Sequence, residues 1–151
     1  MKALIDQYQL TPHPEGGYYK EIYRSAQSVT SPVTGEERQA VTQIYFLLTQ
    51  GEVSRFHRVV HDEIWHFYEG APLALIQYDG ETVTRQVIGP ETGYTAVVPG
   101  GVWQAAESCG DYTLVGCTVA PGFDFKDFTF LSDQPAQAEF MQAHHPYHRF
   151  L

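Results

Sequence analysis

Positively charged residues are scarce in this sequence: nine lysines and arginines stand against 18 aspartates and glutamates in 151 residues, a formal net charge of −9. Proteins that bind nucleic acids need clustered Lys and Arg, because neutralising the phosphates releases counterions. The composition therefore argues against a nucleic-acid partner. It does not argue against a small anionic ligand, since a few converging arginines can dominate the local field.

Long apolar segments and cysteine pairs are also missing. No apolar run approaches the roughly 18 residues of a membrane-spanning helix, and the start, MKALIDQYQL, lacks the apolar core and cleavage site of a secretory leader. The two cysteines, Cys109 and Cys117, form neither a CxxC pair nor a disulfide framework. We therefore expect a soluble cytoplasmic protein with no membrane partner, in which Cys117 is a core residue.

Apolar and aromatic residues are plentiful, at 43% and 14% of the chain, which is typical of a globular domain. From residue 17 onward, short runs rich in Val, Ile, Thr, Tyr and Phe are bounded by Gly, Pro and Asp at a spacing of about ten residues. This rhythm predicts an all-β sandwich or barrel with about nine or ten strands. We expect a single domain over residues 1–151, with the barrel core at about 17–131.

Turn and helix signals complete this outline. In ALIQYDGETVTRQVI, Asp79-Gly80 supplies the positive φ angles of a tight turn and predicts a β-hairpin. A short helix is expected over residues 2–9. A second helix is expected over about 133–145, with Pro135 tolerated in its first turn. The terminal HHPYHR is expected to be a frayed tail.

One crowded stretch, HRVVHDEIWHFYEG at residues 57–70, contains three histidines and an Asp-Glu pair. Successive side chains of a strand point to opposite faces, so alternate residues belong together: Glu63, Trp65 and Phe67 on one face, and Ile64, His66 and Tyr68 on the other. The three histidines therefore cannot all converge. Because both faces are bulky, each should be covered, and we expect a homodimer formed through the outer face.

The same stretch carries a family resemblance. Gly51, His57, Glu63 and Gly70 follow the spacing of the first cupin motif, G-x5-H-x-H-x3-E-x6-G. GYTAVVPGGVWQAAES resembles the second motif, G-x5-P-x-G-x2-H-x3-N, at Gly93, Pro99 and Gly101. Residues 11–131 together resemble a cupin subfamily long catalogued as a domain of unknown function. The resemblance implies the cupin double-stranded β-helix, a jelly-roll barrel.

The resemblance also implies a ligand set. In metal-binding cupins two histidines and a glutamate of the first motif join a histidine of the second. By position His57 and Glu63 are kept, while Val59 and Gln104 replace the other two histidines. Valine cannot ligate and an amide oxygen is a weak ligand, so two good ligands remain where three are usual. We expect no metal cofactor, with the set His57, His61 and Glu63 as the fallback.

Cupins without metal include the deoxysugar epimerases, whose fold resembles this chain and which use a histidine base and a tyrosine acid. By that resemblance His57, Glu63 and Tyr45 are the candidate catalytic residues. Gln104 is expected in the same pocket, and Trp65 would be a stacking wall for a sugar or base. The N-terminal HPEGGYYKEIYR is loosely similar to an epimerase strand that reaches the nucleotide, so Arg24, Arg55 and Lys20 are candidates to meet a phosphate or carboxylate.

Three functions remain open from the residues alone. The leading hypothesis is a metal-free cupin that binds a polar small molecule, sugar-like or nucleotide-like, with epimerase or isomerase chemistry as its extension. The second is a non-catalytic ligand-binding module built from the same pocket. The third is a metal-dependent cupin that uses His57, His61 and Glu63. Fold alone does not decide between them.

Overall fold

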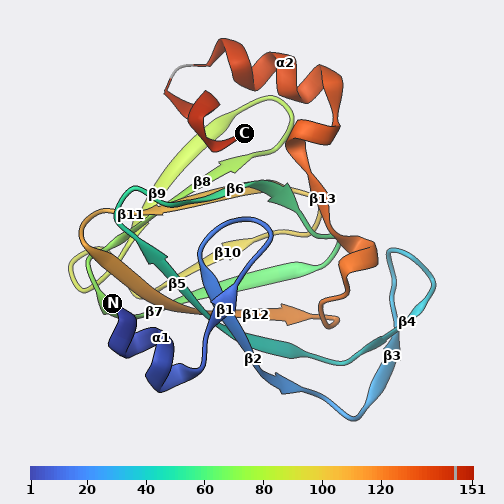
Figure 1. The fold of residues 1–151 in the computed structure, drawn as a ribbon. Helices are drawn as coiled ribbons and strands as arrows, with labels where there is room; N and C mark the ends of the chain where they lie inside the picture. Colours follow the sequence, from blue (N-terminus) through green and yellow to red (C-terminus); the bar gives the residue numbers. More distant parts are fainter. Residues whose placement is uncertain (145) are drawn as a thin grey trace.

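Two antiparallel sheets form the body of the protein, which the computed structural model describes over residues 1–144 and 146–151 (Figure 1). The first sheet has the order β1 (Thr11–Pro12), β2 (Tyr18–Arg24), β5 (Thr42–Thr49), β12 (Tyr112–Ala120), β7 (Asp62–Gly70) and β10 (Thr95–Val98). The second has the order β13 (Thr129–Phe130), β6 (Val53–Arg58), β11 (Trp103–Ser108), β8 (Leu73–Tyr78) and β9 (Val83–Ile88). A separate hairpin pairs β3 (Ser28–Thr30) with β4 (Glu37–Gln39).

The strand order interleaves distant segments, as in a jelly roll. Strand β12 lies between β5 and β7, and β11 lies between β6 and β8, so each sheet joins early and late parts of the chain. The predicted all-β class is confirmed. More strands are present than the sequence predicts, because two-residue strands such as β1 and β13 are too short to leave a periodic pattern.

Three apolar clusters hold the layers together. The main core lies between the sheets and contains Phe46, Trp65 and Val115, all nearly inaccessible. A second core joins the outer face of the second sheet to the C-terminal helices, which lie above that sheet in Figure 1. There Trp103 is buried, as expected for a residue one position from the inward-facing Gln104. The third cluster docks the N-terminal helix α1 (Lys2–Tyr8) on the first sheet.

Strand β7 shows the predicted alternation. Glu63 and Trp65 are buried on the inner face, whereas His66 lies outside and its Nε2 hydrogen-bonds the Thr118 hydroxyl at 3.0 Å. Tyr68, on the same outer face, is 46% exposed. Parity within β7 therefore places His66 on the face opposite Glu63, while His57 belongs to β6 and His61 lies between the two strands.

Glycines end the strands where the motif spacing places them. Gly51 and Gly70 have φ of 84° and 96°, a region that L side chains rarely adopt. At Gly70 a β-carbon would also collide with the Tyr112 backbone carbonyl. The backbone at these two motif positions therefore favours glycine, and the glycines shape the barrel rather than its chemistry.

The predicted hairpin at Asp79-Gly80 is present between β8 and β9, but its turn is longer than expected. Only Gly80 has positive φ, at 103°. The Asp79 carboxylate instead accepts hydrogen bonds from the backbone N–H groups of Glu81 and Thr82, at 2.9 and 2.8 Å. The Asp79 side chain thus closes the loop, in place of the tight turn with positive φ at both residues that the Asp-Gly dipeptide predicted.

The C-terminal end differs more from the prediction. A 3-10 turn over Leu131–Asp133 precedes α2 (Pro135–Ala143), so the helix is shorter than 133–145 and the predicted end at residue 145 lies outside the described residues. The tail is not frayed. Residues Tyr147–Phe150 form a 3-10 turn (η3) whose Phe150 is 1% exposed in the second core. No helix of the described chain is long and apolar enough to cross a membrane.

Candidate functional site

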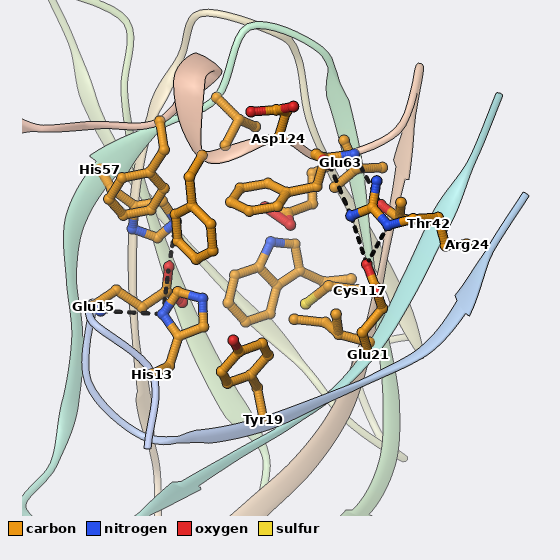
Figure 2. A pocket seen from close by; sticks show the side chains of 17 residues that line it. His13, Glu15, Tyr19, Glu21, Arg24, Thr42, His57, Glu63, Cys117 and Asp124 are labelled. Carbon is orange, nitrogen blue, oxygen red and sulfur yellow. Dashed lines mark hydrogen bonds and ion pairs between the residues drawn. The ribbon is translucent and has the colours of Figure 1, made fainter. Parts of the chain in front are cut away.

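A cavity of about 370 Å³ opens between the two sheets (Figure 2). Strands β2, β5, β6, β7 and β12 supply its walls, together with the segment 13–15 before β2 and the segment 123–128 after β12. Figure 2 shows His13, Glu15 and His57 on one side of the cavity and Glu21 and Arg24 on the other, and aromatic side chains also line it. A cleft of this size and mixture suits a small polar molecule with an apolar face.

A histidine and a glutamate are paired at the base of the cavity. The Nε2 atom of His57 lies 3.0 Å from Oε2 of Glu15, and both residues are buried. The other ring nitrogen, Nδ1, donates to the Arg55 carbonyl oxygen at 2.7 Å. The Ser54 hydroxyl donates to Glu15 Oε1 at 2.9 Å. All polar atoms of the pair are thus bonded within the protein, and His57 has no free nitrogen for a ligand.

The electrostatics of this pair favour its charged form. Burial disfavours a charged imidazole, but the Glu15 carboxylate, and more weakly that of Glu63, outweighs burial and raises the pKa of His57. Burial alone would raise the pKa of Glu15. The charge and hydrogen bond of His57, together with the hydrogen bond from Ser54, outweigh burial and lower this pKa. At neutral pH the two form a buried imidazolium and carboxylate.

A second histidine, His13, completes this side of the cavity. Its Nδ1 accepts a hydrogen bond from the Glu15 backbone N–H at 3.1 Å, so the neutral ring carries its proton on Nε2. Burial lowers the pKa of His13, against the attraction of Glu15. His13 is therefore a neutral hydrogen-bond donor at neutral pH. Its ring packs edge-on against Tyr19, which also lines the cavity.

Glu63 is fixed by a relay of side chains from three strand positions. The Trp65 indole N–H donates to Gln104 Oε1 at 2.8 Å, and Gln104 Nε2 donates to Glu63 Oε1 at 2.6 Å. Gln104 is fully buried behind the cavity wall, while Glu63 and Trp65 line it. The relay settles the orientation of the Gln104 amide. It leaves the second carboxylate oxygen of Glu63 without a hydrogen bond from any described residue.

Burial raises the pKa of Glu63 to about 7, and the negative charge of Glu15 adds to the shift, while His57 and the Gln104 hydrogen bond oppose it. The carboxyl group is therefore divided between its acid and base forms near neutral pH. A general acid or base works best when its pKa lies near the working pH. Within the cavity, Glu63 is the group that meets this condition.

The mouth of the cavity carries an ion pair and a cluster of phenylalanines. Arg24 bonds Glu21 at 2.6 Å and the Phe123 carbonyl at 3.1 Å, so its guanidinium is engaged on both sides (Figure 2). Phe123, Phe125 and Phe128 contact one another with centroid separations of 4.8 to 6.2 Å. These three phenylalanines therefore form part of the cavity wall.

The structure brings together some of the residues predicted from the sequence and separates others. His57, Glu63 and Trp65 line the cavity with Arg24, and Gln104 stands directly behind Glu63. Tyr45 does not face the cavity. The pleat of β5 turns it outward, where it packs against Tyr8 at 5.1 Å in the N-terminal cluster, because its neighbours Ile44 and Phe46 point inward.

Two of the cationic residues expected to contact a ligand, Arg55 and Lys20, lie outside the cavity. The Arg55 guanidinium donates to the Pro14 carbonyl at 3.0 Å and lies over the Phe130 ring, outside the cavity. Lys20 donates to the Gln9 side chain at 2.6 Å on the surface. On β2, the residues on either side of Lys20, Tyr19 and Glu21, line the cavity together with Arg24. The strand therefore contributes the expected Arg24 but not Lys20.

Sequence reasoning missed the segment that supplies His13 and Glu15. Its signal is the glycine pair that follows in HPEGG. Both glycines have positive φ, and a β-carbon at Gly16 would collide with the Val53 carbonyl. The pair thus lets this segment press against β6 and direct Glu15 at His57. A His-Pro-Glu followed by two glycines marks a close approach, although it does not reveal which strand is approached.

Comparison with known proteins shows the family and the fold of this chain. A family model, the cupin superfamily family DUF985, matches residues 2–131. The structure of KdgF from Halomonas sp. shares the fold at 16% identity, with a TM-score of 0.57 over 80% of this chain and 93% of that one. The protein is a cupin. More narrowly, it belongs to the DUF985 family of that superfamily.

Nearer relatives extend over nearly all of the chain. A hypothetical protein from Leishmania major has 33% identity and a TM-score of 0.87, covering 98% of this chain and 96% of its own. The yeast protein named Uncharacterized protein YML079W, from Saccharomyces cerevisiae, is 34% identical over 153 residues, which is 89% of this chain and 76% of that protein. These similarities establish the family without assigning a reaction.

The side chains at the family's metal-ligand positions do not fit a metal. Val59 offers no donor, Gln104 is held by Trp65 and Glu63, and both nitrogens of His57 are bonded. The fallback set is not assembled either, because the His61 ring bonds Ser31 and lies outside the cavity wall. Among residues 1–144 and 146–151, no three His, Cys, Asp or Glu side chains are placed to hold a metal ion.

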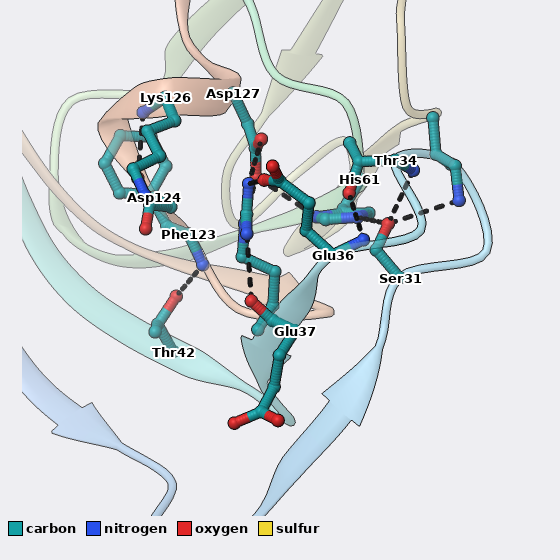
Figure 3. Close-up of polar contacts among 12 residues, drawn as sticks. Ser31, Thr34, Glu36, Glu37, Thr42, His61, Phe123, Asp124, Lys126 and Asp127 are labelled. Atoms are coloured by element: carbon teal, nitrogen blue, oxygen red, sulfur yellow. Dashed lines mark hydrogen bonds and ion pairs between the residues drawn. The ribbon is translucent and has the colours of Figure 1, made fainter.

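His61 instead belongs to a latch that fixes the cavity mouth (Figure 3). Its Nε2 hydrogen-bonds the Ser31 hydroxyl at 2.7 Å, and its Nδ1 lies 3.9 Å from Asp127. Arg38 of β4 bonds both oxygens of Asp127, at 2.9 and 2.8 Å. Asp127 ends the short turn η1 (Phe125–Asp127), so the latch ties the hairpin of β3 and β4 to the aromatic wall.

Replacing Glu63 by glutamine should stabilise the protein in a pH-dependent way. The unfolded carboxyl ionises near pH 4.5 and the folded one near 7, so between these values the unfolded state releases its proton first. Glu63 therefore lowers the free energy of unfolding by an amount that increases from pH 4.5 to about pH 7 and stays constant above pH 7. Glu63→Gln should have little effect at about pH 4 and add about 3 kcal/mol at about pH 8.

Urea unfolding of both proteins across this range measures the difference. Glu69→Gln is the control on the same strand, since Glu69 is exposed and bonds only the Tyr112 hydroxyl. Its effect should be small at every pH. A gain for Glu63→Gln that does not increase between about pH 4 and pH 8 would show that the folded carboxyl is not perturbed.

Removing the latch should loosen the cavity mouth. Asp127→Asn keeps the size of the side chain but removes the charge that Arg38 binds through two hydrogen bonds. Amide hydrogen exchange in residues 123–128 should become at least about tenfold faster, while exchange in β8 and β11 stays the same. Glu36→Gln, which alters the exposed partner of Arg38, is the control. Equal exchange in both variants would contradict a latch.

Proposed function

We propose that this cupin binds a polar small molecule in its cavity and isomerises or epimerises it by proton transfer, without a metal. The observation that carries the proposal is Glu63, a buried carboxyl with one oxygen fixed by Gln104, the other free toward the cavity, and a pKa of about 7. Such a group can take a proton from carbon and return it at neutral pH.

The reaction class follows from this single proton carrier. The Glu63 carboxylate removes a proton from the carbon next to a carbonyl group, and the C–H electron pair moves into an enolate. Return of this proton from Glu63 to the former carbonyl carbon, together with transfer of a proton from a hydroxyl group on the α-carbon to the former carbonyl oxygen, completes an isomerisation. An epimerisation instead needs a proton donated to the opposite face of the same carbon, a role for the Tyr19 hydroxyl, while Glu63 exchanges its proton with solvent. His57 is not the base in this scheme, because the Arg55 carbonyl and Glu15 occupy its nitrogens. Its positive charge stabilises Glu63 when ionised.

The remaining walls suit the other needs of the reaction. An enolate oxygen requires hydrogen-bond donors that are already in place. The His13 Nε2–H and the Tyr19 hydroxyl belong to residues that line the cavity, and Tyr19 replaces Tyr45 as the candidate tyrosine. Trp65 and the phenylalanine cluster offer apolar faces on which a sugar-like ring can stack. A sugar-like carbonyl compound is therefore the substrate class we favour.

Binding without turnover is the second candidate function. It is favoured by the same hydrogen bonds that occupy His57, since the epimerases that this chain resembles use a histidine base. A sensory or carrier module would use the cavity and its walls unchanged. Proton exchange with solvent separates the two functions, because a ligand that is only bound keeps its carbon-bound hydrogens.

Solvent deuterium incorporation tests the catalytic proposal. A panel of keto sugars and small keto acids, incubated with the protein in deuterated buffer, should yield one substrate whose α-carbon gains deuterium in a mass spectrum. Glu63→Gln should slow this exchange by about a hundredfold or more, the usual contribution of a general base. Glu69→Gln should exchange at the rate of the unaltered protein. Exchange that persists in Glu63→Gln would remove Glu63 from the mechanism.

Metal content tests the cofactor part of the proposal. Protein purified without chelator or nickel resin should contain far less than one transition-metal ion per chain by elemental analysis. The positive control is Val59→His combined with Gln104→His, which adds two imidazoles to the Glu63 carboxylate, three ligands without His57, and should bind zinc stoichiometrically. A full equivalent of metal in the unaltered protein would overturn the metal-free proposal.

A further inference from the structure

The cavity contains two positive charges, and each is already balanced. The His57 imidazolium pairs with Glu15 at 3.0 Å. The Arg24 guanidinium pairs with Glu21 at 2.6 Å and also bonds the Phe123 carbonyl. An anionic ligand would have to displace one of these carboxylates to find a partner. The cations in the cavity therefore provide no free site for a phosphate or a carboxylate.

Two carboxyl groups in the cavity, those of Glu63 and Asp124, form no ion pair with a described residue. Glu63 has an oxygen that no described residue bonds. Asp124, at the mouth, accepts a hydrogen bond from the backbone N–H of Lys126 and forms no ion pair with a described residue. The charge of Asp124 contributes to the raised pKa of Arg38, but the side-chain hydrogen bonds of Arg38 to carboxylates go to Asp127 and Glu36. The unbalanced charge of the cavity is negative.

Aromatic rings line the same cavity as these two carboxyl groups. They belong to Trp65, Phe123, Phe125 and Phe128. The faces of aromatic rings attract cations, and carboxylates beside such rings add to the attraction. We propose that the ligand of this cavity carries a positively charged nitrogen, balanced by Glu63 and Asp124 and enclosed by the aromatic walls.

This inference rests on the proposed ligand binding and gives it a substrate class: an amino sugar or another amino carbonyl compound rather than a sugar phosphate. A bound ammonium group favours the ionised form of Glu63, which is the form that removes a proton from carbon. Binding and catalysis would then need the same charge state. The net charge of −9 acts in the same direction, since it attracts cations toward the protein.

The charge of Glu63 couples such binding to pH. The titratable groups that face it are His57, Glu15 and the Cys117 thiol. His57 and Glu15 stay paired near neutral pH, and burial raises the pKa of Cys117, so its thiol stays protonated. Glu63 is thus the group that changes charge near pH 7. Affinity for a cation should increase as the pH rises through 7, with release of a proton on binding.

Three probes of one shape test the inference: choline, 3,3-dimethylbutan-1-ol and 3,3-dimethylbutanoate, which carry a positive charge, no charge and a negative charge. Binding is measured by NMR from the indole N–H signal of Trp65 at about pH 6 and pH 8. Choline should bind at least about tenfold more tightly than the anion at the higher pH, with the alcohol between them. The preference should shrink at the lower pH.

Variants show which carboxyl group is responsible for the preference for choline. Glu63→Gln should reduce the preference for choline and remove its pH dependence, whereas Asp124→Asn should reduce the preference and keep the pH dependence. Glu69→Gln should change neither. Equal binding of all three probes, tighter binding of the anion, or no binding of choline at tens of millimolar would overturn the inference.

The two proposals can fail separately. Choline preference without any deuterium exchange would leave the cationic ligand in place and remove the isomerase. Exchange with a neutral or anionic substrate, and no preference for choline, would support the isomerase and overturn the cationic ligand. A substrate panel that includes glucosamine, glucose and glucose 6-phosphate analogues oxidised to ketones covers the three charge classes in the exchange assay itself.

Discussion

The buried pair of His57 and Glu15 is the interaction on which the rest of the site depends. It attaches the segment before β2 to β6, and it takes both the imidazole and a carboxylate out of the chemistry. The His57 charge and hydrogen bond lower the pKa of Glu15. Burial raises the pKa of Glu63 to about 7, the negative charge of Glu15 adds to that rise, and the His57 charge opposes it. The pair therefore helps to set the charge of Glu63, although burial has the larger effect.

The fold was largely predictable because its signals are local. Alternation in DEIWHFYE placed Glu63 and Trp65 on one face, and the motif glycines marked the turns that their positive φ angles require. The same alternation in β2 and β5 places Lys20 and Tyr45 on the face opposite their sequence neighbours. Alternation alone does not show which face is the inner one, because that depends on the order of the strands in the sheet.

The site was less predictable because its decisive contacts are long-range. Glu15 meets Ser54 across 39 positions, and Arg38 meets Asp127 across 89. Nothing in the local pattern of HPEGG specifies that its glutamate will bind a histidine of β6, and a pKa depends on that partner. His61 shows the converse. Its neighbours in the sequence suggested a ligand, whereas its partners in space, Ser31 and Asp127, make it part of the latch.

Gln104 and Val59 show how a site can change its chemistry with few substitutions. An imidazole at either position would bring a metal ligand toward Glu63, whose carboxylate would then be held ionised by the metal charge. A valine adds only apolar surface, which strengthens the burial that raises the pKa of Glu63. The Gln104 amide donates one hydrogen bond without adding a charge. In the metal-free reaction that we propose, these two positions leave the Glu63 carboxyl group free to exchange protons.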